Sequence, residues 1–147
     1  RIHMPLDGTL RSNVYVPGDL FSVNSATVRA VPRVFARNER LICEFDTAAG
    51  RMAVILIGAL FVGSIETVHC GEVNPPPRAR KQALPIEEGI GRAFVKGEEL
   101  GRFNMGSTVI LLFQSQRVRW DATLEPDTEV RLGRAIGRMN VNYLTAQ

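Results

Sequence analysis

A serine that follows a glycine at the start of an apolar run can attack its own upstream peptide bond. Gly106, Ser107 and Thr108 form such a triplet, and residues 109–113 are all apolar. Glycine leaves the approach to its carbonyl open and tolerates a distorted backbone. Attack by Ser107 Oγ on the Gly106 carbonyl would convert the amide into an ester. β-Elimination would then release the upstream chain and leave dehydroalanine, which hydrolyses to a pyruvoyl group and ammonia.

The predicted pyruvoyl group would be a covalent cofactor made from Ser107. Its ketone can form a Schiff base with an amine and take up the electrons that remain when carbon dioxide departs. We therefore expect cleavage between Gly106 and Ser107 into residues 1–106 and 107–147. Two other motifs are excluded, because Ser107 stands where a phosphate-binding loop needs lysine, and Met105 and Val109 stand where a nucleophile elbow needs glycine.

The two histidines receive different interpretations. His3 is the candidate base for Ser107, because an imidazole can take up a serine proton near neutral pH and return it to a leaving group. His69 is followed by Cys70, but the chain lacks the C-x-x-C or H-x-x-x-H spacing of a metal site. We interpret His69 as structural or as part of a site's rim, and we predict no metal.

Five segments, in order and in spacing, resemble the bacterial phosphatidylserine decarboxylase family. They are residues 1–5 with Gly8, 16–24, 35–40, 62–68 and 96–113, and the similarity fades after Arg117. Residues 105–108 resemble the family's self-cleavage signature Leu-Gly-Ser-Thr. Met105 replaces the leucine, which is a near-isosteric exchange.

The resemblance implies a pyruvoyl-dependent enzyme that converts phosphatidylserine to phosphatidylethanolamine and carbon dioxide. Ser107 resembles the residue that becomes pyruvoyl, and His3 resembles the base of an Asp-His-Ser relay. The relay aspartate has no counterpart in this sequence. In the family it lies upstream, with membrane-associating helices and a further histidine, so the proton returned to Cα would come from that histidine or from His3. Arg37 and Asn38 are candidate ligands of the phosphoserine head.

The resemblance also implies partners and a location. We expect a peripheral protein on the cytoplasmic face of a bacterial inner membrane, which binds phosphatidylserine in an anionic membrane. A homodimer and continued association of the two cleaved chains are expected as well. The net charge of +3 is compatible with an anionic surface and too weak to indicate nucleic acid. Arg78, Arg80 and Lys81 could contact lipid phosphates.

The length of 147 residues and the apolar content of 45% predict a single domain over residues 1–147, and the resemblance implies that this domain is catalytic. Turn signals recur about every ten residues between short β-branched or alternating runs, which indicates a mostly antiparallel all-β fold, similar to barrel-sandwich hybrids, with little helix. The expected strands are residues 13–16, 41–46, 51–57, 61–68, 107–113 and 118–120. We expect a buried hairpin within residues 52–62, one short helical turn within 26–35 and a loop over 70–92.

Two alternatives to the favoured function stay open. The first is a lipoyl- or biotinyl-type carrier or binding module, for which Lys96 before Gly97 is the candidate attachment residue. The second is a pyruvoyl decarboxylase that acts on a soluble amino acid. Intact mass distinguishes a carrier, which gains mass on one lysine, from a chain that is cut at Gly106.

Overall fold

The computed structural model of the chain describes residues 1–60, 64–73, 83–106 and 108–140. Most of these residues lie in antiparallel strands, and the two helices among them are short, α1 (Ser25–Ala30) and α2 (Val34–Arg37). The Asn24 side chain caps α1 by accepting a hydrogen bond from the Thr27 backbone N–H at 2.9 Å. The predicted all-β class with little helix is confirmed.

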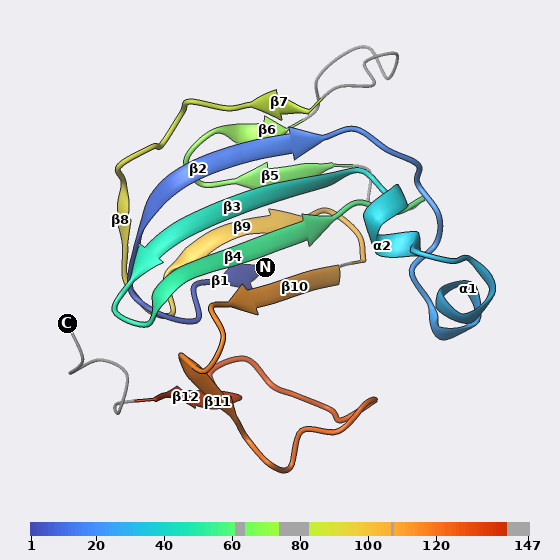
Figure 1. Cartoon of the computed structure of the whole chain (residues 1–147). Coiled ribbons are helices and arrows are strands. Elements are labelled where there is room, and N and C mark those ends of the chain that lie inside the picture. Colours follow the sequence, from blue (N-terminus) through green and yellow to red (C-terminus); the bar gives the residue numbers. More distant parts are fainter. Residues whose placement is uncertain (61–63, 74–82, 107, 141–147) are drawn as a thin grey trace.

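The larger sheet contains six of the described strands (Figure 1). Its centre is β2 (Gly8–Val16), β3 (Arg40–Thr47) and β4 (Gly50–Ile57), which pair in sequence order. One edge is β10 (Thr108–Phe113), and at the other edge β7 (Leu84–Pro85) and β8 (Ala93–Phe94) both pair with β2. Strands that lie about 100 residues apart in the sequence, β2 and β10, therefore belong to one sheet.

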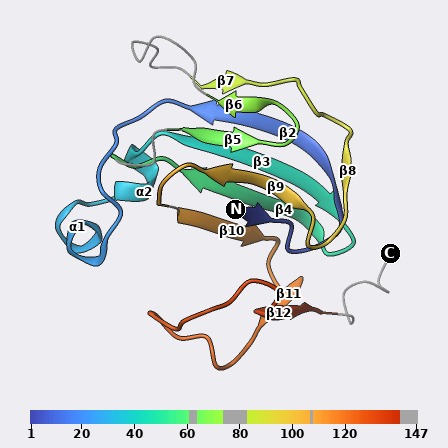
Figure 2. The same ribbon diagram turned by 180° about the vertical axis from the view of Figure 1, so that it is seen from behind.

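The smaller sheet has the strand order β1-β9-β5-β6. These strands are β1 (Ile2–His3), β9 (Glu99–Phe103), β5 (Ile65–Thr67) and β6 (Gly71–Val73). A separate two-stranded ribbon, β11 (Val118–Trp120) with β12 (Gly137–Met139), lies below the sheets in both views (Figures 1 and 2).

The hydrophobic core lies between the two sheets. Alternate residues of β3 and β4 are buried, as expected for strands with one face on a core. Side chains from both sheets form one cluster, and its fully buried members include Leu41, Phe45, Val54, Ile65 and Leu100. The fold is therefore a β-sandwich, and the strands next to the candidate site are anchored in its two layers.

Three local predictions need correction. The apolar run that begins at Met52 forms a single strand that ends at Ile57, and its hairpin partner is the preceding strand β3, because both strands need a neighbour to complete their hydrogen bonds. The helical turn expected within 26–35 is two helices. The expected loop over 70–92 contains β6 and β7, while residues 74–82, with Arg78, Arg80 and Lys81, lie outside the described residues.

Candidate active site

The predicted cleavage site lies on the link between the two sheets. Phe103, the last residue of β9, pairs with Ile65 in the smaller sheet, and Thr108, the first residue of β10, pairs with Ile57 in the larger sheet. Gly106 lies on this link with a φ of 69°, in the left-handed region that glycine adopts more easily than other residues. The backbone at Gly106 is therefore one that a glycine tolerates better than other residues.

Strand β9 is held firmly before the link. Arg102 donates two hydrogen bonds to the Glu66 carboxylate, from Nε at 2.9 Å and from Nη2 at 2.7 Å. A Cβ atom at Gly101 would lie 2.3 Å from the Glu66 carbonyl oxygen, so only glycine allows β9 and β5 to approach this closely. After the strand, the Asn104 side-chain amide donates to Ser64 Oγ.

The described residues of the link lie at the surface. Asn104, Met105 and Gly106 are exposed, and Met105 retains 63% of its accessible area. Residue 107 lies outside the described residues. An apolar pocket around Ser107 that opens toward one face therefore stays a prediction.

His3 lies at the edge of the smaller sheet, where it pairs with Glu99 of β9. Its side chain is half-buried, and within the described part of the chain its buried Nδ1 atom has no hydrogen-bond partner. A histidine that acts as a base is usually oriented through its second ring nitrogen, often by a carboxylate. The orphaned Nδ1 is thus the atom at which such a carboxylate would bind.

The register of β1 does not by itself bring His3 to Gly106. His3 pairs at the first residue of β9, whereas Gly106 follows the last residue, Phe103. Four strand steps between Glu99 and Phe103 correspond to about 13 Å. Contact between His3 and Ser107 stays a prediction that would require the link to return toward β1.

Arg37 and Asn38 lie where the 16–24 and 35–40 segments contact each other. The Asp19 backbone N–H donates to the Arg37 carbonyl at 2.8 Å, and a Cβ atom at Gly18 would lie 2.3 Å from the same oxygen. The Arg37 guanidinium pairs with the Asp19 carboxylate at 3.2 Å and lies 4.4 Å from the centre of the Phe21 ring. Two of the five family-like segments therefore form one packed unit.

The Asn38 side chain is completely buried and bonded to backbone groups. Its amide nitrogen donates to the carbonyls of Phe21 at 2.8 Å and Gly58 at 2.9 Å, and its oxygen accepts from the Phe21 N–H at 3.0 Å. These contacts favour a structural role for Asn38. Substrate binding by Arg37 and Asn38 stays a prediction.

A buried polar network around Asn13 was not anticipated from the sequence. Asn13 Nδ2 donates to His69 Nε2 at 3.1 Å, and Asn13 Oδ1 accepts from the Cys43 thiol at 3.3 Å. Burial, and then the nearby Arg92 charge, lower the pKa of His69, while burial and Cys70 raise the pKa of Cys43. The one available signal was a polar residue at an inward-facing position of β2.

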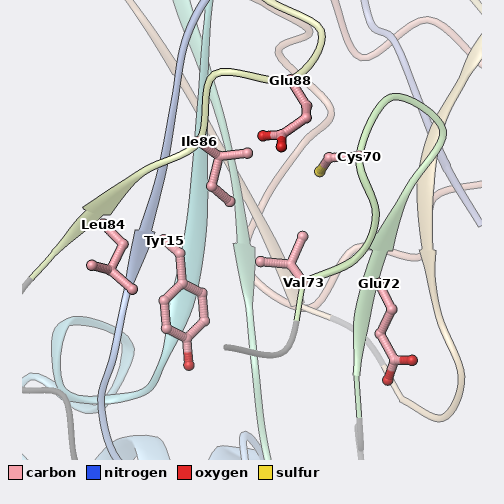
Figure 3. A pocket seen from close by; sticks show the side chains of 7 residues that line it. All are labelled: Tyr15, Cys70, Glu72, Val73, Leu84, Ile86 and Glu88. Carbon is pink, nitrogen blue, oxygen red and sulfur yellow. The ribbon is translucent and has the colours of Figure 1, made fainter. Parts of the chain in front are cut away.

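A hollow of about 250 Å³ lies beside this network (Figure 3). Its walls are mostly apolar, with Glu72 and Glu88 among the lining residues, which also include Tyr15, Cys70, Val73, Leu84 and Ile86. Two carboxylates disfavour binding of an anionic phospholipid head. The hollow is therefore a poor candidate for binding the phosphoserine head that the family resemblance leads us to expect.

Among the described residues, no group of three or more His, Cys, Asp or Glu side chains could hold a metal ion. Neither α1 nor α2 has the length and apolar character needed to cross a bilayer.

The fold and the link together define a β-sandwich protein with a candidate self-cleavage site between its sheets. A family model described as phosphatidylserine decarboxylase matches residues 1–138. The chain therefore belongs to the phosphatidylserine decarboxylase family, as the five segments indicated. We expected the similarity to fade after Arg117, but the match continues to residue 138. The expectation was wrong because the ribbon segment has no short motif that reveals the similarity.

Named relatives show the same similarity. The chain is 56% identical over 142 residues to the phosphatidylserine decarboxylase proenzyme of Azotobacter vinelandii, which covers 96% of this chain and 50% of the relative. It is 56% identical over 137 residues to the protein of that name from Methylococcus capsulatus, and this alignment covers 93% of this chain and 47% of the relative. The phosphatidylserine decarboxylase proenzyme of Stutzerimonas stutzeri is 52% identical over 148 aligned positions, and the alignment covers 100% of this chain and 50% of the relative. The chain thus spans about half the length of the curated relatives it matches.

Family membership also weighs against the carrier alternative. Lys96 is exposed in the turn between β8 and β9, and its backbone N–H donates to Asp7 Oδ1 at 2.6 Å. Such a turn could present a lysine. The matched family, however, is a family of decarboxylases.

Proposed function

We propose that the protein containing this chain cuts itself between Gly106 and Ser107 and then decarboxylates phosphatidylserine to phosphatidylethanolamine. The observation that carries the proposal is the left-handed Gly106 directly before a serine, on a link between two anchored strands. Its setting in a family whose named relatives are proenzymes adds support. A proenzyme is a form that must be processed before it acts.

The link favours the first chemical step in two ways. Glycine places no side chain over the carbonyl that Ser107 Oγ would attack. Strands β9 and β10 hold both ends of the link, so the hydroxyl and the carbonyl would stay close without a large loss of entropy on reaction. The N–C bond between Gly106 and Ser107 breaks as the O–C ester bond forms.

In this proposal His3 moves the proton. It takes the proton of Ser107 Oγ as the ester forms and passes it to the Ser107 nitrogen as the peptide bond breaks. An acceptor at the orphaned Nδ1 would hold the ring in the tautomer whose Nε2 is free to act as the base. The relay aspartate expected from the family resemblance would fill that position.

A pyruvoyl group at residue 107 would supply the electron sink for the loss of carbon dioxide. The surrounding residues fit such a group. Gly106 would become the new carboxyl end of an exposed segment, while β10 keeps residues 108–113 in the sheet.

We place the protein at a membrane because the proposed substrate is a lipid, and the net charge of +3 is favourable at an anionic surface. The cytoplasmic face of a bacterial inner membrane and a homodimer remain parts of this proposal. Both rest on the family resemblance.

The test uses the full-length protein that contains this chain. Ser107→Ala should remain uncut on a denaturing gel and release no labelled carbon dioxide from phosphatidylserine vesicles. Ser115→Ala, at an exposed position after β10, is the matched control and should be cut normally. Decarboxylation of free amino acids but not of the lipid would support the soluble-substrate alternative. Normal turnover by uncut Ser107→Ala would refute the proposal.

A further inference from the structure

The ribbon of β11 and β12 has two like charges directly opposite each other. Arg119 pairs with Arg138 in the antiparallel register, and like charges in this arrangement destabilise a strand pair. Neither guanidinium lies within 4.0 Å of a carboxylate among the described residues. The residues outside the described ranges contain no Asp or Glu, so within residues 1–147 no Asp or Glu side chain forms an ion pair with these two arginines.

One carboxylate lies near the pair, and it is already engaged. Asp121 Oδ1 accepts hydrogen bonds from the Thr123 N–H at 2.9 Å and from Thr123 Oγ1 at 2.8 Å. These bonds lower the pKa of Asp121, with smaller contributions from Arg134 and Arg138. Arg134 and Arg138 therefore share one carboxylate, and the ribbon keeps a local positive charge at Arg119 and Arg138.

The arginines face away from the sandwich. The Trp120 ring packs edge-on against Phe113 at 5.6 Å between ring centres, which turns one face of the ribbon toward β10. Neighbouring residues of a strand project to opposite faces, and directly paired residues share a face. Arg119 and Arg138 therefore occupy the outer face.

A hollow of about 430 Å³ lies beside the arginine pair. It is lined by Arg119, Trp120, Asp121, Ala122, Ala135, Gly137 and Arg138. Three of these residues are alanine or glycine, so small side chains leave room between two guanidinium groups. Arginine is well suited to a phosphate in such a space, because its planar fork can donate two parallel hydrogen bonds.

Exposed apolar side chains lie in the loop that joins the two strands. Val130 is 56% exposed and Leu132 is 77% exposed. Exposed apolar side chains near basic residues suit the surface of an anionic bilayer, where both kinds of side chain find partners. The loop between the strands carries the acids Glu125, Asp127 and Glu129 as well as Arg131 and Arg134, so the excess of positive charge lies on the strands.

We propose that the outer face of the β11–β12 ribbon binds the phosphate groups of an anionic phospholipid surface through Arg119 and Arg138. A free phosphate compound would satisfy the arginines but not the exposed Val130 and Leu132. The inference deepens the proposed peripheral location by naming the residues that contact lipid. Its test measures binding, so it can fail or succeed independently of decarboxylation.

The first measurement is binding of the full-length protein to phosphatidylcholine vesicles with and without phosphatidylglycerol. Arg119→Gln/Arg138→Gln should weaken binding to the anionic vesicles by about 30-fold, as expected for two basic residues at such a surface. Arg29→Gln/Arg51→Gln is the matched control, because both residues are exposed and the net charge falls equally. Equal losses in the two double variants would overturn the proposal.

The second measurement separates a lipid surface from a free phosphate. Soluble glycerol phosphate should not abolish binding of the full-length protein to the anionic vesicles. Loss of vesicle binding in the presence of glycerol phosphate would mean that the site recognises the phosphate alone. The melting temperature of Arg119→Gln/Arg138→Gln should be unchanged or higher, because a like-charge contact is removed.

Discussion

Asn13 Nδ2 lies 3.1 Å from His69 Nε2 and joins the two sheets of the sandwich through the core. Asn13 belongs to β2 of the larger sheet, and His69 lies in the turn between β5 and β6 of the smaller one. Because the amide nitrogen donates, His69 Nε2 must accept, and the ring must be neutral. Protonation of His69 removes this acceptor.

The first prediction follows from the lowered pKa of His69. Since the folded-state pKa lies below the ordinary value, the unfolded chain binds a proton more readily. His69 therefore contributes stability above about pH 6.5 that is lost as the pH falls toward its folded-state pKa. Melting temperatures between about pH 7.5 and 5.5 should fall less steeply for His69→Gln than for the wild type. Identical slopes would show that His69 does not titrate differently on folding.

Asn38 should matter for stability far more than its neighbour. Asn38→Ala removes three hydrogen bonds and leaves buried backbone groups of Phe21 and Gly58 without partners. We expect a loss of about 2 to 4 kcal/mol in the free energy of unfolding. Arg37→Gln removes an exposed ion pair and should cost less than about 1 kcal/mol. Urea unfolding measures both, and similar losses in the two variants would contradict the interpretation of Asn38 as structural.

Gly106→Ala should slow self-cleavage. A residue with a side chain at a φ of 69° costs about 1 to 2 kcal/mol and partly covers the carbonyl under attack. The cleavage rate of the full-length protein should fall by about tenfold, followed by intact mass over time. Gly133→Ala is the control, since Gly133 has a φ of 82° on the distant ribbon segment. Cleavage slowed equally by both changes would indicate a general loss of folding.

His3→Gln should reduce cleavage of the full-length protein by about 10²- to 10⁴-fold if His3 is the base. Glutamine keeps a polar side chain of similar length but cannot take up the serine proton. His69→Gln changes the other histidine and should leave the rate nearly unchanged at neutral pH. A rate for His3→Gln within about twofold of the wild type would assign the proton transfer to another group.

The sequence predicted strands better than their partners. Alternation within 41–46 and 51–57 identified β3 and β4 within a few residues, because these strands bury one face along their whole length. The wrong hairpin within 52–62 shows the limit, since an apolar run does not reveal which neighbouring strand completes its hydrogen bonds.

The candidate site divides in the same way. That Gly106 tolerates a left-handed φ could be predicted, because glycine has no Cβ atom, although Gly18 and Gly101 show that a glycine need not adopt such a φ. The buried amides of Asn13 and Asn38 could not, because their partners lie 17 or more positions away in the chain, as in the pairs with Phe21 and His69. A polar side chain reveals its role only when the fold brings such partners to it.

The pairing of β10 with β4 determines what a break before residue 107 would mean. Six consecutive residues from Thr108 to Phe113 are in register with Ile57 to Met52, and none of these pairs involves the Gly106–Ser107 bond. After cleavage, the downstream fragment would no longer be covalently linked to the upstream fragment but would stay bound to it through the β10–β4 hydrogen bonds. Cleavage would free the reactive end at residue 107 while the sheet around it stays assembled. The two fragments would then act as one non-covalent complex, in which one fragment carries the reactive group and the other holds it in place.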